Sequence, residues 1–346
     1  MIVNQSIPEN FKEKYNIFLA LLRMYLEFIV VNSHCLDPSK LNNKIIIKLL
    51  YNKIPVPIFF IISFYFFFNL LSSRNIKKIK QRFERLLIPY FIWPIFIWII
   101  NNFLKFFLKW ETENSINDLK MQLLTGHWFM RVLWFQYNLV FITLIVVIFE
   151  FLIEKNKELI FINLEIIAYF FQYSNLNYQI FSKYSLYKKY TLGRFLEVIP
   201  FCITGYILAS LKIIHYLKKH SIMTIYFFLT IIWFVIKYNV FIEIKGFLYQ
   251  GIRLQIISIL IFIIFSLFPS QKIKNKNIIK TIRFITNNTS GIYFLHYSIS
   301  NYLNKYIILI KNKTLFGCII IYIICYFISF FGLRIFGKTK LRNLFQ

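Results

Sequence analysis

Long apolar runs recur along this chain from residue 17 to residue 336 and constrain its fold more than any other feature. Ten runs are candidate membrane spans, and most reach the roughly 20 residues that a helix needs to cross about 30 Å of hydrocarbon. They are continuous rather than alternating, which excludes the strands of a membrane barrel. The sequence therefore predicts an all-α, polytopic integral membrane helical bundle of about ten transmembrane helices. The runs cover residues 17–36, 54–72, 86–108, 132–153, 159–174, 195–211, 222–242, 251–268, 290–310 and 314–336.

The apolar runs leave no stretch for a separate soluble domain. Of the 346 residues 58% are hydrophobic, more than a soluble chain of this length can bury beneath a polar shell. We therefore expect one transmembrane domain over residues 1–346. The fifth run, residues 159–174, is short and carries Glu165, so whether it crosses fully stays open.

The strong positive charge is concentrated in short loops between the apolar runs. The net charge of +27 comes from 41 Lys and Arg against 14 Asp and Glu. The most basic loops, Arg74 to Arg85 and Ser270 to Arg283, fall on one side of a ten-helix topology, which the positive-inside rule makes cytoplasmic. Both termini would then be cytoplasmic too. We expect a multi-pass protein of the bacterial cytoplasmic membrane, whose basic residues contact membrane lipids rather than nucleic acid.

The first apolar run carries ionisable residues, which are costly in a membrane and usually face the bundle interior. Arg23 and Glu27 are four residues apart and can pair on one helix face. Arg23 and His34 are eleven apart, three turns plus about 20°, so they share a face about 16 Å apart. That separation suits the two ends of a long ligand. Taken alone, His34 fits a site residue and an interfacial histidine equally well.

No cysteine pattern indicates a metal or redox site. The four cysteines form no Cys-x-x-Cys pair and lie in or beside apolar runs, where packing is their usual role. We expect no metal. These cysteines are Cys35, Cys202, Cys318 and Cys325.

With these motifs, the chain resembles the acyltransferase-3 family, membrane enzymes that acylate carbohydrates and other acceptors. The family marker is an Arg followed by ten residues and a His in the first helix, matched by Arg23 and His34. The chain departs from the family at Phe64, where Gly usually follows the Ser of the second helix, and at Glu27, which is outside the pattern. Further stretches fit in order along nearly the whole chain: VPIFFIISFYFFF from Val56, QRFERLLIPYFIWPIF from Gln81, VLWFQYNLVF from Val132, FLEVIPFCITGYIL from Phe195 and SGIYFLHYSI from Ser290.

The resemblance implies transfer of an acyl group, most often acetyl, from acyl-coenzyme A to a hydroxyl of a surface glycan. His34 is then the expected base, because neutral imidazole accepts a proton near pH 7. Arg23 lies deeper, where it could bind the donor's arm or a phosphate. Arg82 and Arg85 share a helix face and suit phosphate, although anchoring to lipid head groups explains them as well.

Two further residues are candidates for the cavity wall. His296 matches the family's late-helix His and could line the cavity or simply pack. Trp134 could stack on a sugar, although Trp near the end of a span more often belongs to the interfacial aromatic belt. Glu27 completes the expected lining.

Two other functions compete with acyl transfer. A transporter or glycan flippase explains many helices and buried charges, but it predicts internal repeats and helices broken by Gly or Pro, whereas the chain has only 9 Gly and 8 Pro and no visible repeat. A glycosyltransferase using a lipid-linked sugar usually has acidic residues in its first outer loop. That loop offers only Asp37 among four lysines.

Overall fold

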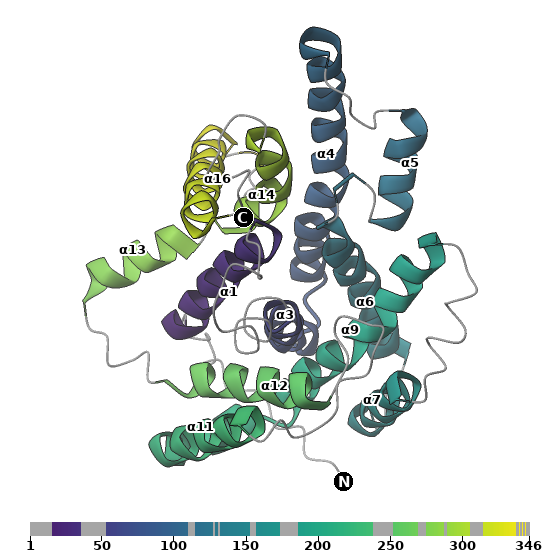
Figure 1. Ribbon diagram of the computed structural model, residues 1–346. Coiled ribbons are helices and arrows are strands. Elements are labelled where there is room, and N and C mark those ends of the chain that lie inside the picture. The colour runs from purple at the N-terminus through teal and green to yellow at the C-terminus, as the bar shows by residue number, and fades with distance from the viewer. Residues whose placement is uncertain are drawn as a thin grey trace.

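The computed structural model describes most of the chain, and every element in the described part is helical (Figure 1). The described residues are 16–35, 53–109, 115–126, 129–130, 132–152, 157–173, 186–237, 252–268, 275–286, 289–304, 314–336, 339, 341 and 343. The elements are α1 (Ile17–Cys35), α3 (Pro55–Ser72), α4 (Ile76–Leu108), α5 (Ile116–Thr125), α6 (Leu133–Leu152), α7 (Lys157–Tyr173), α9 (Leu186–Ser210), α10 (Ile213–Leu217), a 3-10 turn (Lys218–His220), α11 (Ser221–Lys237), α12 (Ile252–Leu267), α13 (Lys276–Thr286), α14 (Thr289–Leu303) and α16 (Leu315–Phe336).

The structure supports a multi-pass membrane protein. Five described helices are long and apolar enough to cross a membrane, and a sixth is added if α9 and the α10–α11 segment, which meet at a 60° bend, form one span. The backbone turns at Lys212, whose φ of 51° lies in the left-handed region. The five are Ile17–Cys35, Pro55–Ser72, Ile76–Phe107, Leu133–Leu152 and Leu315–Phe336.

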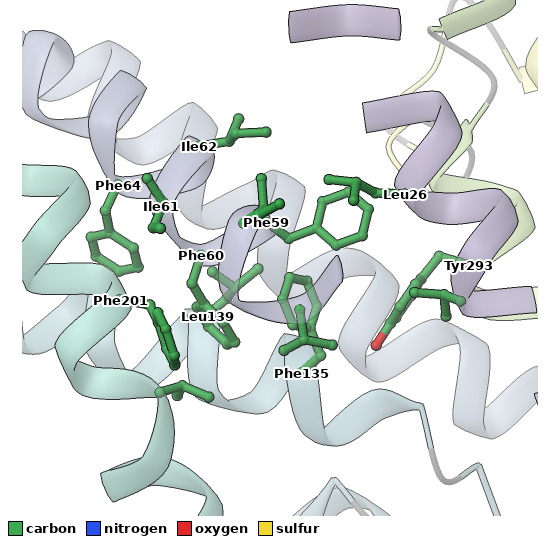
Figure 2. Packing of buried hydrophobic residues seen from close by; sticks show 14 of the residues in the cluster. Leu26, Phe59, Phe60, Ile61, Ile62, Phe64, Phe135, Leu139, Phe201 and Tyr293 are labelled. Carbon is green, nitrogen blue, oxygen red and sulfur yellow. The ribbon is translucent and has the colours of Figure 1, made fainter. Parts of the chain in front are cut away.

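Helix α3 forms the centre of the bundle, seen nearly end-on in Figure 1 among α1, α4, α6, α9 and α12. Its side chains Phe60, Ile61 and Phe64 have no exposed surface. Figure 2 shows Phe60 beside Phe201 of α9 and Leu139 of α6. The ring of Phe60 lies 4.6 Å from that of Phe135. The aromatic side chains of α3 thus form a rigid surface next to the polar residues of α1 and α4.

Gly205 on α9 allows a close approach between the backbones of α9 and α3. A Cβ on Gly205 would lie 2.4 Å from the carbonyl oxygen of Ile61 on α3. Small residues permit such backbone contact between membrane helices. The α3 helix thus accommodates the bulky, fully buried Phe64, while α9 provides the small residue for tight packing.

The basic stretch that we expected as a loop, residues 74–85, is mostly the start of α4. The Asn75 side chain accepts from the backbone N–H of Lys78 and caps the helix. Lys and Arg are good helix formers, so the helix begins in the basic stretch and continues into the apolar one. At 33 residues α4 is about 50 Å long, which exceeds the hydrocarbon thickness. Its first turns therefore extend the basic residues beyond the apolar layer.

The short fifth apolar run forms α7, and its carboxylate has a partner. The hydroxyl of Thr204 on α9 donates to Glu165 at 2.6 Å, and that of Tyr206 donates to Glu150 of α6 at 2.6 Å. These two bonds tie α6 and α7 to α9. A carboxylate in an apolar run is thus accommodated by packing, whether or not α7 crosses the membrane.

Candidate functional site

A cavity of about 780 Å³ opens between α1, α3, α4, α6 and α14. It brings together three of the arginines singled out in the sequence, Arg23, Arg82 and Arg85, together with Glu27. The spacing of these residues in the sequence does not predict their convergence, because Arg23 lies on α1 and the other two arginines lie on α4. The cavity thus combines a cationic side with an apolar wall.

The α1 side of the cavity is an ion pair. Nε of Arg23 lies 3.5 Å from Oε1 of Glu27, one helical turn away, as the spacing predicts. The Arg23 side chain is 40% exposed and that of Glu27 only 4%. The buried Glu27 carboxylate therefore contacts Arg23 through Nε, and the partly exposed Arg23 side chain lines the cavity.

The α4 side holds one arginine firmly. Nη2 of Arg82 donates to Oγ of Ser63 at 2.9 Å, and the guanidinium carbon lies 4.2 Å from the ring centre of Phe67. Both partners belong to α3. Its buried Nε has no hydrogen-bond partner among the described residues. Arg85, one turn later, lines the same cavity and is exposed. The pair thus consists of one guanidinium held by α3 and one exposed charge.

The apolar side of the cavity is lined by Phe59 of α3, Phe135 of α6 and Tyr293 of α14. Figure 2 shows these three side chains gathered together, with Leu26 of α1 beside them. Tyr293 donates its hydroxyl hydrogen to the carbonyl oxygen of Val132 at 2.9 Å, which ties α14 to the start of α6.

Gln136 and Tyr293 line the cavity and were missed by sequence reasoning. Gln136 donates to the carbonyl oxygen of Leu86 at 2.8 Å, in the turn of α4 that precedes Pro89. Pro89 lacks the N–H that would bond the carbonyl of Arg85 four residues earlier, and the Gln136 bond to the adjacent carbonyl ties α6 to this weakened turn. An amide inside the apolar run of α6 was the available signal.

His34 lies outside the cavity lining and is connected to it through His296 and Tyr293 of α14. Its ring centre is 5.2 Å from that of His296 and 5.8 Å from that of Tyr297. His296 in turn lies 6.0 Å from Tyr293, which lines the cavity. A continuous row of rings therefore connects the cavity wall with the exposed imidazole of His34.

His296 is the fully buried member of that row. Its side chain has no exposed surface, and its Nδ1 lies 3.2 Å from the carbonyl oxygen of Ile292. A proton on Nδ1 satisfies that contact and leaves Nε2 as an acceptor. Nε2 has no hydrogen-bond partner among the described residues.

Trp134 lies outside the cavity lining and stacks with an arginine of α9. The guanidinium of Arg194 on α9 is 5.5 Å from its ring centre. Arg194 also pairs with the fully buried Glu197 at 2.8 Å. The structure therefore places Trp134 beside a second ion pair.

Within the described residues, no group of three or more His, Cys, Asp or Glu side chains is arranged to hold a metal ion. All four cysteines are buried free thiols.

Comparison with known proteins identifies the family. The family model described as an acyltransferase domain matches residues 16–334, nearly the whole chain. No curated protein and no solved structure matches the chain significantly. The matched range begins just before α1 and ends near the end of α16, so it includes the cavity and the row of rings. The chain therefore belongs to the acyltransferase-3 family and is a membrane acyltransferase.

Proposed function

We propose that this protein transfers an acyl group, most often acetyl, from acyl-coenzyme A to a hydroxyl of a cell-surface or exported glycan. It works as a multi-pass enzyme of the bacterial cytoplasmic membrane, with about ten spans and both termini in the cytoplasm. One observation carries the proposal. A single cavity joins Arg23, Arg82 and Arg85 to an apolar wall, and a row of rings leads from that wall to His34.

The cavity suits a donor with a phosphorylated head and a long thioester arm. Arg82 and Arg85 stand near the start of α4 with Lys78, the side at which anionic phosphates would enter from the cytoplasm. Guanidinium groups bind phosphate through paired hydrogen bonds. The arm would lie along the apolar wall toward Arg23. Lys78, Arg82 and Arg85 thus bind the phosphates of the donor, and the cavity interior orients its thioester arm.

The chemistry needs a base on the acceptor side. The acceptor oxygen attacks the thioester carbonyl, and His34 takes the hydroxyl proton as the new C–O bond forms. The C–S bond then breaks, and coenzyme A leaves as a thiolate that recovers a proton. His34 is exposed and suits an acceptor arriving from outside the bundle. His296 contacts the His34 ring and holds it in position.

The decisive experiment measures acyl transfer with purified protein in proteoliposomes, using labelled acetyl-coenzyme A and surface glycan extracted from cells that lack the gene. His34→Ala should abolish transfer while the protein stays inserted and folded. His215→Ala is the matched control, because this histidine is exposed on α10, away from the cavity lining. Full activity of the His34 variant would refute its role as base.

The glycan acceptor is tested separately in cells. The O-acetyl content of surface glycans should fall when the gene is deleted, return with the wild-type gene, and stay low with the Arg23 or His34 variants. Movement of labelled glycan across the membrane without consumption of acyl-coenzyme A would instead support the transporter alternative.

A further inference from the structure

Helix α13 is amphipathic, a property that the proposed acyl transfer does not need. It spans Lys276–Thr286, about 16 Å, which is too short to cross the hydrocarbon layer. Its four isoleucines fall within about 120° of the helix circumference at 100° per residue, and Lys280 and Arg283 share the remaining face. The sequence predicted only a basic loop here, because the loop's basic residues mask the isoleucine spacing. The isoleucines are Ile278, Ile279, Ile282 and Ile285.

Only part of the apolar face of α13 is covered by protein. The helix packs against α1, and its last residue, Thr286, is 5% exposed and lines the cavity. Ile278 on that face stays 48% exposed, and Phe284, about 120° away round the helix and outside the isoleucine face, is 50% exposed. Figure 1 shows α13 projecting from the side of the bundle beside α1 and α16. One end of the helix is therefore fixed to the cavity, while apolar side chains along it remain uncovered.

On α13 and α16, the charged residues beside the uncovered side chains are positive. The ring of Phe284 lies 5.5 Å from that of Phe330 on α16, and the guanidinium of Arg334 lies 5.4 Å from the Phe330 ring. Lys280, Arg283 and Arg334 are exposed, and neither α13 nor α16 contains an acidic residue. Basic residues flanking exposed apolar ones are typical of helices that lie in a membrane interface.

We propose that α13 is an interfacial helix that binds anionic phospholipid. Ile278 and Phe284 enter the acyl-chain boundary, and the cationic groups of Lys280, Arg283 and Arg334 bind the head-group phosphates. Charge complementarity selects an anionic lipid, since a zwitterionic head group offers no net charge to three cations. Because Thr286 lines the cavity, the bound lipid lies beside the donor site and anchors the helix that borders it. The inference concerns lipid binding and does not depend on acyl transfer.

The test uses the full chain in nanodiscs of phosphatidylcholine with or without phosphatidylglycerol. An environment-sensitive fluorophore is attached to I278C, which is selective because the four natural cysteines are buried. Phosphatidylglycerol should protect the label from acrylamide, a neutral aqueous quencher, and expose it to brominated acyl chains. High salt should reverse both changes, because surface electrostatics are screened. The matched label is I116C on α5, 75% exposed, which should not respond.

The charge dependence supplies the second arm. Lys280→Gln, Arg283→Gln and Arg334→Gln should each raise the phosphatidylglycerol fraction needed for half-maximal protection by roughly fivefold. Lys120→Gln, an exposed lysine on α5, is the control and should leave that fraction unchanged. Equal behaviour of the two labels, or of all the charge variants and wild type, would overturn the proposal. Protection by free coenzyme A in place of phosphatidylglycerol would also overturn it, by assigning the cations to a soluble phosphate.

Discussion

His34 of α1 and His296 of α14 face each other with their ring centres 5.2 Å apart, one imidazole exposed and the other fully buried. The buried ring thus forms a fixed surface beneath the exposed one. Nothing in the sequence joins these two positions, since each lies in a separate apolar run. The contact supports the proposed role of His296 as a positioning residue for His34 and makes that role testable.

Replacing His296 by Asn should slow turnover more than it weakens donor binding. The Asn amide can keep the hydrogen bond to the carbonyl oxygen of Ile292, but it removes the ring that supports His34. We expect kcat to fall about 10- to 100-fold, the range for disturbed general base catalysis, with KM for acyl-coenzyme A nearly unchanged. Steady-state kinetics of the purified protein measure both.

The control for His296 is Tyr297→Phe, which keeps the aromatic ring that contacts His34 edge-on and removes only its hydroxyl. This variant should retain nearly wild-type kcat. A wild-type kcat in His296→Asn would show that the histidine contact has no part in turnover, whereas loss of folded protein would show that the buried ring is structural.

The Arg23–Glu27 pair should be energetically asymmetric. Arg23→Met leaves a carboxylate that is 4% exposed without its guanidinium, and removing one partner of such a buried pair is costly. We expect a loss of about 2 kcal/mol or more in unfolding free energy. Glu27→Gln leaves a guanidinium that still reaches solvent and should cost about 1 kcal/mol or less.

Thermal unfolding in detergent measures that asymmetry, and the double variant is its control. Arg23→Met combined with Glu27→Gln should be more stable than Arg23→Met alone, because the buried charge is then removed with its partner. Equal losses for the two single variants would contradict the burial difference seen between the two side chains.

Local spacing predicted the contacts within helices, and tertiary packing decided the contacts between them. The Arg23–Glu27 pair follows from a separation of four residues, and the apolar runs follow from the length that a bilayer requires. The convergence of Arg82 with Arg23, the contact between His34 and His296, and the position of Trp134 beside Arg194 depend on how the helices pack. Helix α13 was not predicted because the basic residues of the stretch 270–283 masked its isoleucine spacing. The roles of the site residues stay predictions.

Gly205→Ala should separate α3 from α9. The added Cβ would lie 2.4 Å from the carbonyl oxygen and 3.1 Å from the Cα of Ile61, and backbone atoms cannot move aside as a flexible side chain can. We expect a loss of about 2 kcal/mol in stability, within the range for overpacking. Thermal unfolding is the measurement. Ser210→Ala on the same helix is the control, since it adds no bulk. Unchanged stability of the Gly205 variant would mean that the two helices are less tightly packed than observed.

Arg82→Lys should separate the role of charge from that of shape at the cavity mouth. Lysine keeps the positive charge but loses the planar group that lies over Phe67 and reaches Ser63. We expect KM for acyl-coenzyme A to rise about tenfold with a smaller change in kcat, because paired hydrogen bonds to phosphate are lost. The same substitution at Arg85, which is exposed and acts through charge, should raise KM much less. Titration of donor binding together with initial rates distinguishes the two. If Arg85→Lys were the more damaging change, the exposed arginine would be the one that grips the phosphate, and Arg82 would serve to hold α4 against α3.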